Sequence, residues 1–170
     1  MSAKTFWGKY RGVVVDNKDP LGIARICAKV SDVLADRPST WAMPCLPMAG
    51  NHCGIHSVPP VGAGVWIEFE QGDPNKPIWC GGFYGGTGEL PPTVSAGQPG
   101  SPSVVIQSIG GHTMGVSDAA GPNGGILLKI SGGASIAISD AGITIDNGKG
   151  ASIALQGNTV SVNGGALMVM

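Results

Sequence analysis

Two cysteines and two histidines in one short segment have the side-chain types that bind metals. Cys45, His52, Cys53 and His56 offer thiol and imidazole donors, which zinc favours. The four residues match no standard zinc spacing, and their segment is rich in proline and glycine. We therefore favour a structural or incidental role for them, and we predict no bound metal and no cofactor.

Paired carboxylates and a His/Ser/Asp group come closest to catalytic chemistry. Glu68 and Glu70 alternate on one face of an expected strand, as an acid/base pair would, but the apolar residues around them predict an ordinary solvated strand face. His112, Ser117 and Asp118 are accompanied by no nucleophile elbow and no oxyanion loop. We predict no catalytic residues and no enzymatic activity.

Three tryptophans are candidates for stacking on nucleic-acid bases. Trp41, Trp66 and Trp79 lie on expected strands that also need a core, and basic residues are not interleaved with them. Ten Lys and Arg residues face eleven Asp and Glu residues, without a basic cluster to hold phosphates. Core or interface packing is therefore favoured, and no nucleic-acid partner is expected. No apolar run approaches the roughly 18 residues of a membrane-spanning helix.

The elements that position these residues in the first half are short strands separated by Gly/Pro turns, without a long helical period. We predict a small, antiparallel, hairpin-rich barrel of the OB type over residues 1–84. The expected strands are 10–15, 23–30, 40–45, 65–70 and 76–80.

The second half has a different chemistry. No aromatic residue follows Tyr84, no cysteine follows Cys80, and residues 85–103 form a linker rich in Gly, Pro and Ser that we expect to be extended. The predicted second domain spans residues 104–170, and from Gly125 on, pairs of the type I-x-I, L-x-I or V-x-V return every seven to ten positions between small or polar residues. This alternation puts one face of each short strand inward.

One chain of this second half lacks the large side chains needed to fill a core of its own. We predict an intertwined trimeric β-helix, a β-prism in which three chains share one axis and bury the apolar pairs against each other. The trimer-core residues that we predict are Leu128, Ile130, Ile136, Ile138, Ile143, Ile145, Ile153, Leu155, Val160 and Val162.

The N-terminus has no long apolar region with a cleavage site, so we expect no secretory signal and folding in a cytoplasm. Four cysteines in such a chain are expected to be thiols rather than a disulfide framework.

Three segments carry a resemblance to a known family. They are residues 10–26 (YRGVVVDNKDPLGIARI), residues 39–45 (STWAMPC) and residues 59–79 (PPVGAGVWIEFEQGDPNKPIW). The chain resembles the central spike protein of contractile phage tails, the baseplate assembly protein V family. The start of its repeats, from Gly111-His112-Thr113-Met114 to Gly125-Ile126, is similar to the start of the family's β-helix.

The resemblance implies an OB domain followed by a trimeric β-helix, in a homotrimer on the axis of a virion tail baseplate that assembles in the bacterial host cytoplasm. It implies a baseplate hub protein and the tail tube or adjacent baseplate proteins as partners, and a transient passage through the target outer membrane. Spikes of type VI secretion and of extracellular contractile injection systems share these domains. Because the OB domain begins within the first ten residues, we expect the hub to be a separate protein.

The chain departs from the family at its end. Some short members end in a His-x-His motif that holds an apical iron, whereas no histidine follows His112 here. We therefore predict no apical iron, and a separate conical tip protein that docks on Leu167, Met168, Val169 and Met170. The linker also leaves no room for the lysozyme domain that other members insert.

The resemblance implies a mechanical function, a structural spike that helps to pierce the target cell envelope, and two other functions are considered beside it. An OB module that binds single-stranded nucleic acid through the barrel, with an oligomerising tail, would require salt-sensitive binding to a single strand. A fibrous adhesin for surface glycans would need exposed aromatic residues on the rod, and the repeats contain none.

Overall fold

The computed structural model describes residues 4–95, 103–121 and 124–169. The chain divides into two compact units, Met1–Glu89 and Leu90–Met170. The strands and few short helices confirm the predicted all-β class. Within the described residues, no helix is both long enough and apolar enough to cross a membrane.

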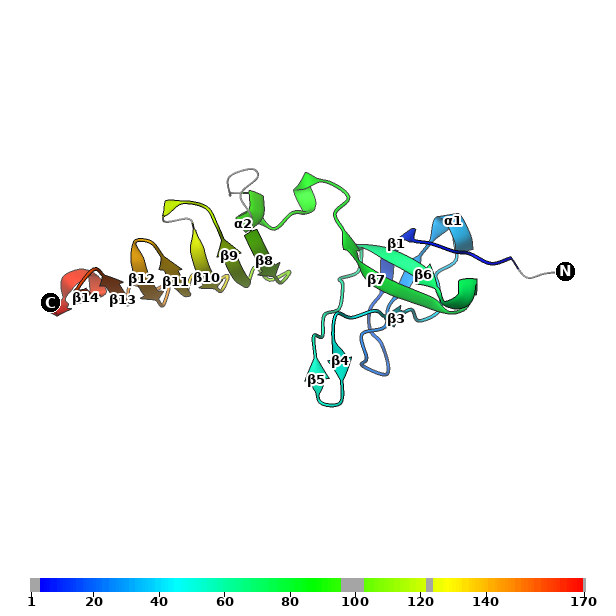
Figure 1. Ribbon diagram of the computed structural model, residues 1–170, viewed down its shortest axis with the longest axis horizontal. Coiled ribbons are helices and arrows are strands. Elements are labelled where there is room, and N and C mark those ends of the chain that lie inside the picture. The colour runs from blue at the N-terminus through cyan, green and yellow to red at the C-terminus, as the bar shows by residue number, and fades with distance from the viewer. Residues whose placement is uncertain (1–3, 96–102, 122–123, 170) are drawn as a thin grey trace. The chain divides into compact units, whose positions relative to one another are not determined.

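The first unit is built on a five-stranded sheet with the order β2-β1-β6-β7-β3 (Figure 1). Its strands are β1 (Tyr10–Asp16), β2 (Cys27–Lys29), β3 (Met43–Pro44), β6 (Gly64–Phe69) and β7 (Pro77–Phe83). Two short helices accompany them, α1 (Ser31–Leu34) and the 3-10 turn η1 (Glu70–Gly72).

Alternation along the strands builds the core of this unit. In β6 the side chains of Val65, Ile67 and Phe69 are buried, while those between them are half-exposed. The buried apolar residues are Val14, Ala24, Ile26, Ala28, Val30, Ala42, Val65, Ile67, Phe69 and Trp79.

Three features of the first unit differ from the sequence predictions. The expected strand 23–30 shrinks to β2, because Ala24 has a positive φ of 65° and the residues before Arg25 wrap around the carboxylate of Asp19. The prediction of a purely antiparallel order is wrong, because β3 runs parallel to β7. Parallel pairing does not need a hairpin, so no turn in the sequence marks it.

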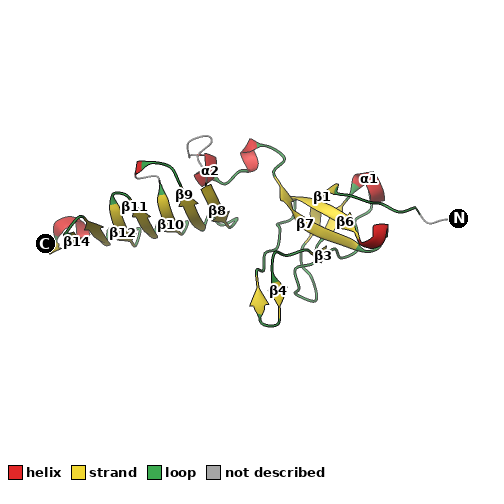
Figure 2. Cartoon of the chain, in the orientation of Figure 1, coloured by secondary structure: helices red, strands yellow, loops and turns green. Residues whose placement is uncertain are grey.

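The segment predicted as an irregular Pro/Gly-rich loop contains a small hairpin. Its strands β4 (Ala49–Gly50) and β5 (Cys53–Gly54) pair antiparallel around Asn51 and His52, and Figure 2 shows the hairpin extending away from the five-stranded sheet. His52 has a φ of 57° at this turn.

The second unit is a single sheet of eight antiparallel strands, each paired with the strands before and after it in the chain (Figure 1). At a strand spacing of about 4.8 Å, eight strands extend over roughly 34 Å. The strands are β8 (Ser103–Gln107), β9 (Thr113–Ser117), β10 (Gly125–Lys129), β11 (Ser135–Ser139), β12 (Gly142–Asp146), β13 (Ser152–Gln156), β14 (Thr159–Val162) and β15 (Leu167–Val169). A 3-10 turn, η4 (Asn163–Gly165), joins the last two.

The segment predicted as an extended linker contains two short helical turns, η2 (Thr87–Glu89) and α2 (Pro92–Ser95). A proline at the first position of a helix is favourable, which explains why Pro92 opens α2. The rest of the predicted linker up to β8, residues 96–102, lies outside the described residues.

Candidate trimer interface

The register of the eight-stranded sheet aligns the apolar pairs into two continuous columns on one face. Each strand contributes one residue to each column, because residues two apart in a strand point to the same face. The first column is Ile106, Met114, Leu128, Ile136, Ile145, Ile153, Val162 and Leu167. The second column is Val104, Val116, Ile126, Ile138, Ile143, Leu155, Val160 and Val169.

A single chain leaves these two columns uncovered. Of their sixteen side chains, fourteen are between 37% and 66% exposed, and Ile143 and Val162 are half-buried. Among the described residues, all buried apolar side chains lie between Val14 and Trp79, in the other unit. Two adjacent columns, each of eight uncovered apolar side chains, form a contiguous apolar surface, which is rare on monomers and marks an interaction face.

On β11 to β14 the opposite face carries small or polar residues at its centre, whereas Val105 on β8 and Leu127 on β10 are apolar. These centre residues are in register with one another, and each lies in sequence between the two column residues of its strand. On β11 to β14 they are Ala137, Thr144, Ala154 and Ser161. These four strands therefore have one face suited to burial and one suited to water.

The first column forms the floor of an open trough of about 900 Å³. Ile106, Leu128, Ile136, Ile145 and Ile153 all line it, together with residues of the turns at that end of the strands. The trough is a surface that side chains from other chains can fill, and its lining is mainly aliphatic.

Two glycines permit the close stacking of successive strands. Gly142 has a φ of 129°, and a Cβ atom there would collide with the carbonyl oxygen of Leu155 on β13. Gly148 has a φ of 70°, and a Cβ atom there would lie 2.7 Å from the carbonyl carbon of Gly133 in the neighbouring turn. Only glycine combines this backbone conformation with this approach.

Nine of the ten residues predicted for the trimer core lie in the two columns. The tenth, Ile130, follows the end of β10 and lines the trough from the turn. The in-register pair on β10 is Ile126 and Leu128 rather than the predicted Leu128 and Ile130.

The sequence prediction missed five residues of the two columns, Ile126 and the two pairs on β8 and β9. Val104 and Ile106 pair in register with Val116 and Met114. Both pairs have the same x-separated apolar pattern as the later ones, so an earlier start of the repeat would have included them.

Three of the four residues predicted for tip docking form the last strand. Leu167 and Val169 are 60% and 57% exposed on β15, which is an edge strand of the sheet. Met168 lies between them in β15, and Met170 lies outside the described residues.

The Cys/His segment is not drawn together into a metal site. Cys53 lies on β5 and His52 in the hairpin turn, whereas Cys45 follows β3 and donates its N–H to the carbonyl oxygen of Trp79. Within the described residues, which include Cys45 and His56, no three His, Cys, Asp or Glu side chains are placed to hold a metal ion.

The residues with catalytic side-chain types either lie apart from each other or are engaged in structural contacts. His112 and Ser117 lie at opposite ends of β9, and the Nδ1 atom of His112 accepts a hydrogen bond from the N–H of Ser131 in the next turn. Glu68 forms an ion pair of 2.7 Å with Lys9, while Glu70 lies past β6 in η1.

The three tryptophans have packing partners within the barrel, and the guanidinium of Arg25 lies 5.6 Å from the ring centroid of Trp41. Trp79 is 5% exposed, and its indole N–H donates to the carbonyl oxygen of Ala24. Trp66 packs against Phe83, and the guanidinium of Arg11 lies over both rings. These contacts support the packing role over base stacking.

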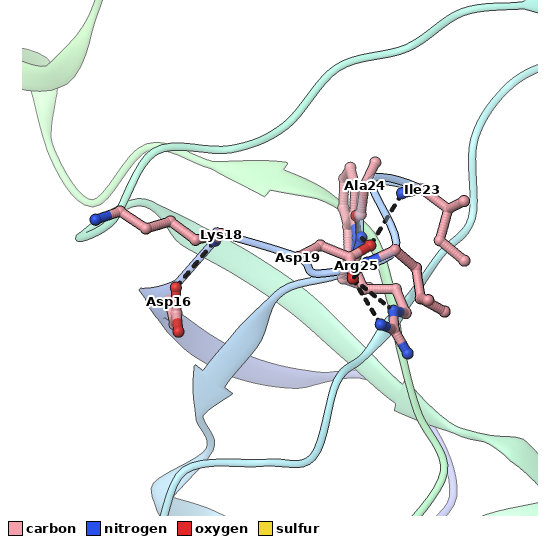
Figure 3. Close-up of polar contacts among 8 residues, drawn as sticks. Asp16, Lys18, Asp19, Ile23, Ala24 and Arg25 are labelled. Atoms are coloured by element: carbon pink, nitrogen blue, oxygen red, sulfur yellow. Dashed lines mark hydrogen bonds and ion pairs between the residues drawn. The ribbon is translucent and has the colours of Figure 1, made fainter.

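A carboxylate positions the loop between β1 and β2 (Figure 3). Asp19 accepts hydrogen bonds from the backbone N–H groups of Leu21, Ile23 and Arg25. It also forms an ion pair of 2.6 Å with the Arg25 guanidinium. The hydrogen bond from the Arg25 side chain is the main cause that holds the pKa of Asp19 well below its usual range, and the backbone N–H groups contribute less. Partial burial opposes the shift. The charged form of Asp19 therefore stabilises the loop.

Comparison with protein families gives two matches. Residues 10–84 match the type VI secretion system/phage-baseplate injector OB domain, and residues 103–168 match the phage baseplate V C-terminal trimerisation domain. No similar sequence is found among curated proteins. The two matches cover the barrel and all of the eight-stranded sheet except its last residue, and they agree with an uncovered apolar face that needs other copies. The chain belongs to the baseplate V family of contractile-tail spike proteins, as a structural baseplate component with a trimerisation domain.

Proposed function

We propose that three copies of this chain form the central spike of a contractile tail and help to pierce the target cell envelope. The observation that carries the proposal is the pair of uncovered apolar columns on one sheet face. Three such faces turned toward a common axis bury all of them in one narrow prism. The small residues on the opposite face of β11 to β14 then form a slim outer surface.

Stiffness under axial load is the physical requirement for such a spike. In the proposed prism each strand is hydrogen-bonded to its neighbours along the chain and packed against two other chains. Unfolding one chain therefore exposes apolar surface on all three at once, which makes the assembly cooperative. The function is mechanical and needs no catalytic group.

Partners are proposed for both units of the chain. The barrel would contact the baseplate hub, and with it the tail tube or adjacent baseplate proteins. The exposed Leu167 and Val169 on the edge strand β15 support docking of a separate conical tip protein at the other end. The outer membrane of the target cell would be contacted transiently. The free thiols of all four cysteines suit assembly in a reducing host cytoplasm.

The test compares the mass in solution of the full chain with that of a truncation ending at Glu89, the last residue of the first unit. We expect the full chain at three times its 17.1 kDa mass and the truncation as a monomer. Light scattering behind a sizing column measures both. A monomeric full chain would overturn the spike proposal. A trimeric truncation would show that the trimer contacts lie in the barrel instead of the eight-stranded sheet.

A further inference from the structure

Two thiols face each other on the outer surface of the barrel where β3 meets β7. Pro44 stands opposite Trp79 in this parallel pair, and the N–H of Cys45 donates to the Trp79 carbonyl oxygen over 2.8 Å. In a parallel ladder that bond places Cys45 opposite Cys80, the next residue along β7. The Trp79 side chain points into the core, so the two cysteines share the outer face.

The spacing of the two residues suits a disulfide. Neighbouring strands lie about 4.8 Å apart, and in-register Cα atoms at that spacing fall within the roughly 4.4–6.8 Å that disulfides span. Both thiols are free in the structure, and they are 35 positions apart in the sequence, at residues 45 and 80.

The surroundings give the two thiols different roles. Cys45 is exposed, whereas Cys80 is half-buried and accepts a hydrogen bond of 3.2 Å from the ammonium group of Lys9. Burial raises the pKa of Cys80, and the Lys9 hydrogen bond opposes that shift by stabilising the thiolate. Lys9 is itself held in place by its ion pair with Glu68.

We propose that Cys45 and Cys80 form a dithiol site that reacts with low-molecular-weight disulfides and closes to an intrachain disulfide. The Cys45 thiolate attacks one sulfur of the disulfide RSSR, forms the mixed disulfide Cys45–S–S–R and releases RS⁻. The Cys80 thiolate beside Lys9 then attacks the Cys45 sulfur and releases the second RS⁻. The two thiolates RS⁻ take up the two cysteine protons, so both cysteines are oxidised and RSSR is reduced to two RSH.

The bond would link the shortest strand of the five-stranded sheet to its neighbour. β3 contributes only two residues to the sheet, and the chain between the two cysteines contains the β4–β5 hairpin and β6. Closing a loop of about 35 residues lowers the entropy of the unfolded chain and so stabilises the folded barrel. The site lies within the barrel alone and does not depend on the proposed function.

The test exposes the reduced full chain to oxidised glutathione and follows mass, peptide map and thermal unfolding. We expect a loss of two hydrogen atoms per chain, no retained glutathione, a Cys45–Cys80 cross-link in the peptide map, and a rise in Tm of roughly 10 °C or more. Retained glutathione on Cys45, a cross-link to a different cysteine, or an unchanged Tm would each overturn the proposal.

Three variants separate the steps. Cys80→Ser is expected to keep glutathione on Cys45, because the resolving thiol is gone. Lys9→Gln should form the same cross-link several times more slowly, because less Cys80 is present as thiolate. Cys53→Ser serves as the matched control and should behave as the original chain. Loss of cross-linking in this control, or an unchanged rate in Lys9→Gln, would contradict the assigned roles.

Discussion

Replacing Ile145 by Asp tests the assignment of the apolar columns most directly. Ile145 lies near the middle of the first column, in register with Ile136 on β11 and Ile153 on β13. In one chain its side chain is still 44% exposed, so nearly half of its burial is left for contacts with other chains. The substitution replaces that apolar surface by a carboxylate at three places around one axis.

The magnitude follows from two terms. Burying an isoleucine side chain fully stabilises by about 1.5–3 kcal/mol, so the uncovered part of Ile145 accounts for about 1 kcal/mol per chain. A buried Asp must be protonated, which at pH 7 costs about 4 kcal/mol for three units above its ordinary pKa. The sum is about 15 kcal/mol per trimer, equivalent to roughly ten powers of ten in the assembly constant.

Sedimentation or light scattering of the full chain at micromolar concentration measures this effect. Ile145→Asp is expected to run at the monomer mass or to aggregate, while Thr144→Asp keeps the trimer. Thr144 is the matched control, because it is the adjacent residue on the same strand and points to the opposite face, between Ala137 and Ala154. A soluble trimer of Ile145→Asp would refute the inward orientation of the columns, and dissociation of Thr144→Asp would place the interface on the other face.

Three further predictions concern the strand stacking and the barrel. Gly142→Ala should destabilise the trimer by more than about 1 kcal/mol per chain, because the new Cβ meets the carbonyl oxygen of Leu155; Gly150→Ala, with a positive φ but open space, is the control in thermal melts. Trp79→Phe removes the N–H that satisfies a buried carbonyl, and should lower the urea-unfolding free energy of the barrel by about 1–3 kcal/mol without changing the slope. Asp19 has a lowered pKa in the folded state, so its stabilisation is complete above the unfolded pKa of about 4 and is lost as the pH falls below it. The Tm difference between the original chain and Asp19→Asn should therefore shrink on acidification below about pH 4, and a constant difference would contradict a role for the ionised carboxylate.

Much of the second unit could be predicted from local pattern. Alternation of period two is a property of each short segment, so pairs such as Ile143 and Ile145 identify the apolar face without knowledge of any neighbour. The register was less accessible, because it depends on where each turn begins. The shift from Leu128/Ile130 to Ile126/Leu128 on β10 is an error of this kind.

The barrel was predictable where the strands are long and less so where they are short. β1, β6 and β7 lie close to their expected ranges, since each has a clear apolar alternation. The shortened β2 was not predictable from propensity. The strand is short because the Asp19 carboxylate accepts hydrogen bonds from backbone N–H groups that would otherwise join the sheet. Ile23 donates one of them, although its side chain favours a strand.

The sequence by itself determined the all-β class, the division in chemistry near Tyr84 and the face of the repeats that needs a partner. These properties follow from composition and from periodicity within a few residues. Only the tertiary structure decided that β3 pairs with β7 in parallel. That pairing places Cys45 next to Cys80. Parallel strands are joined by a long crossover whose end point is set by packing of the whole barrel, so no local pattern records which residues become neighbours.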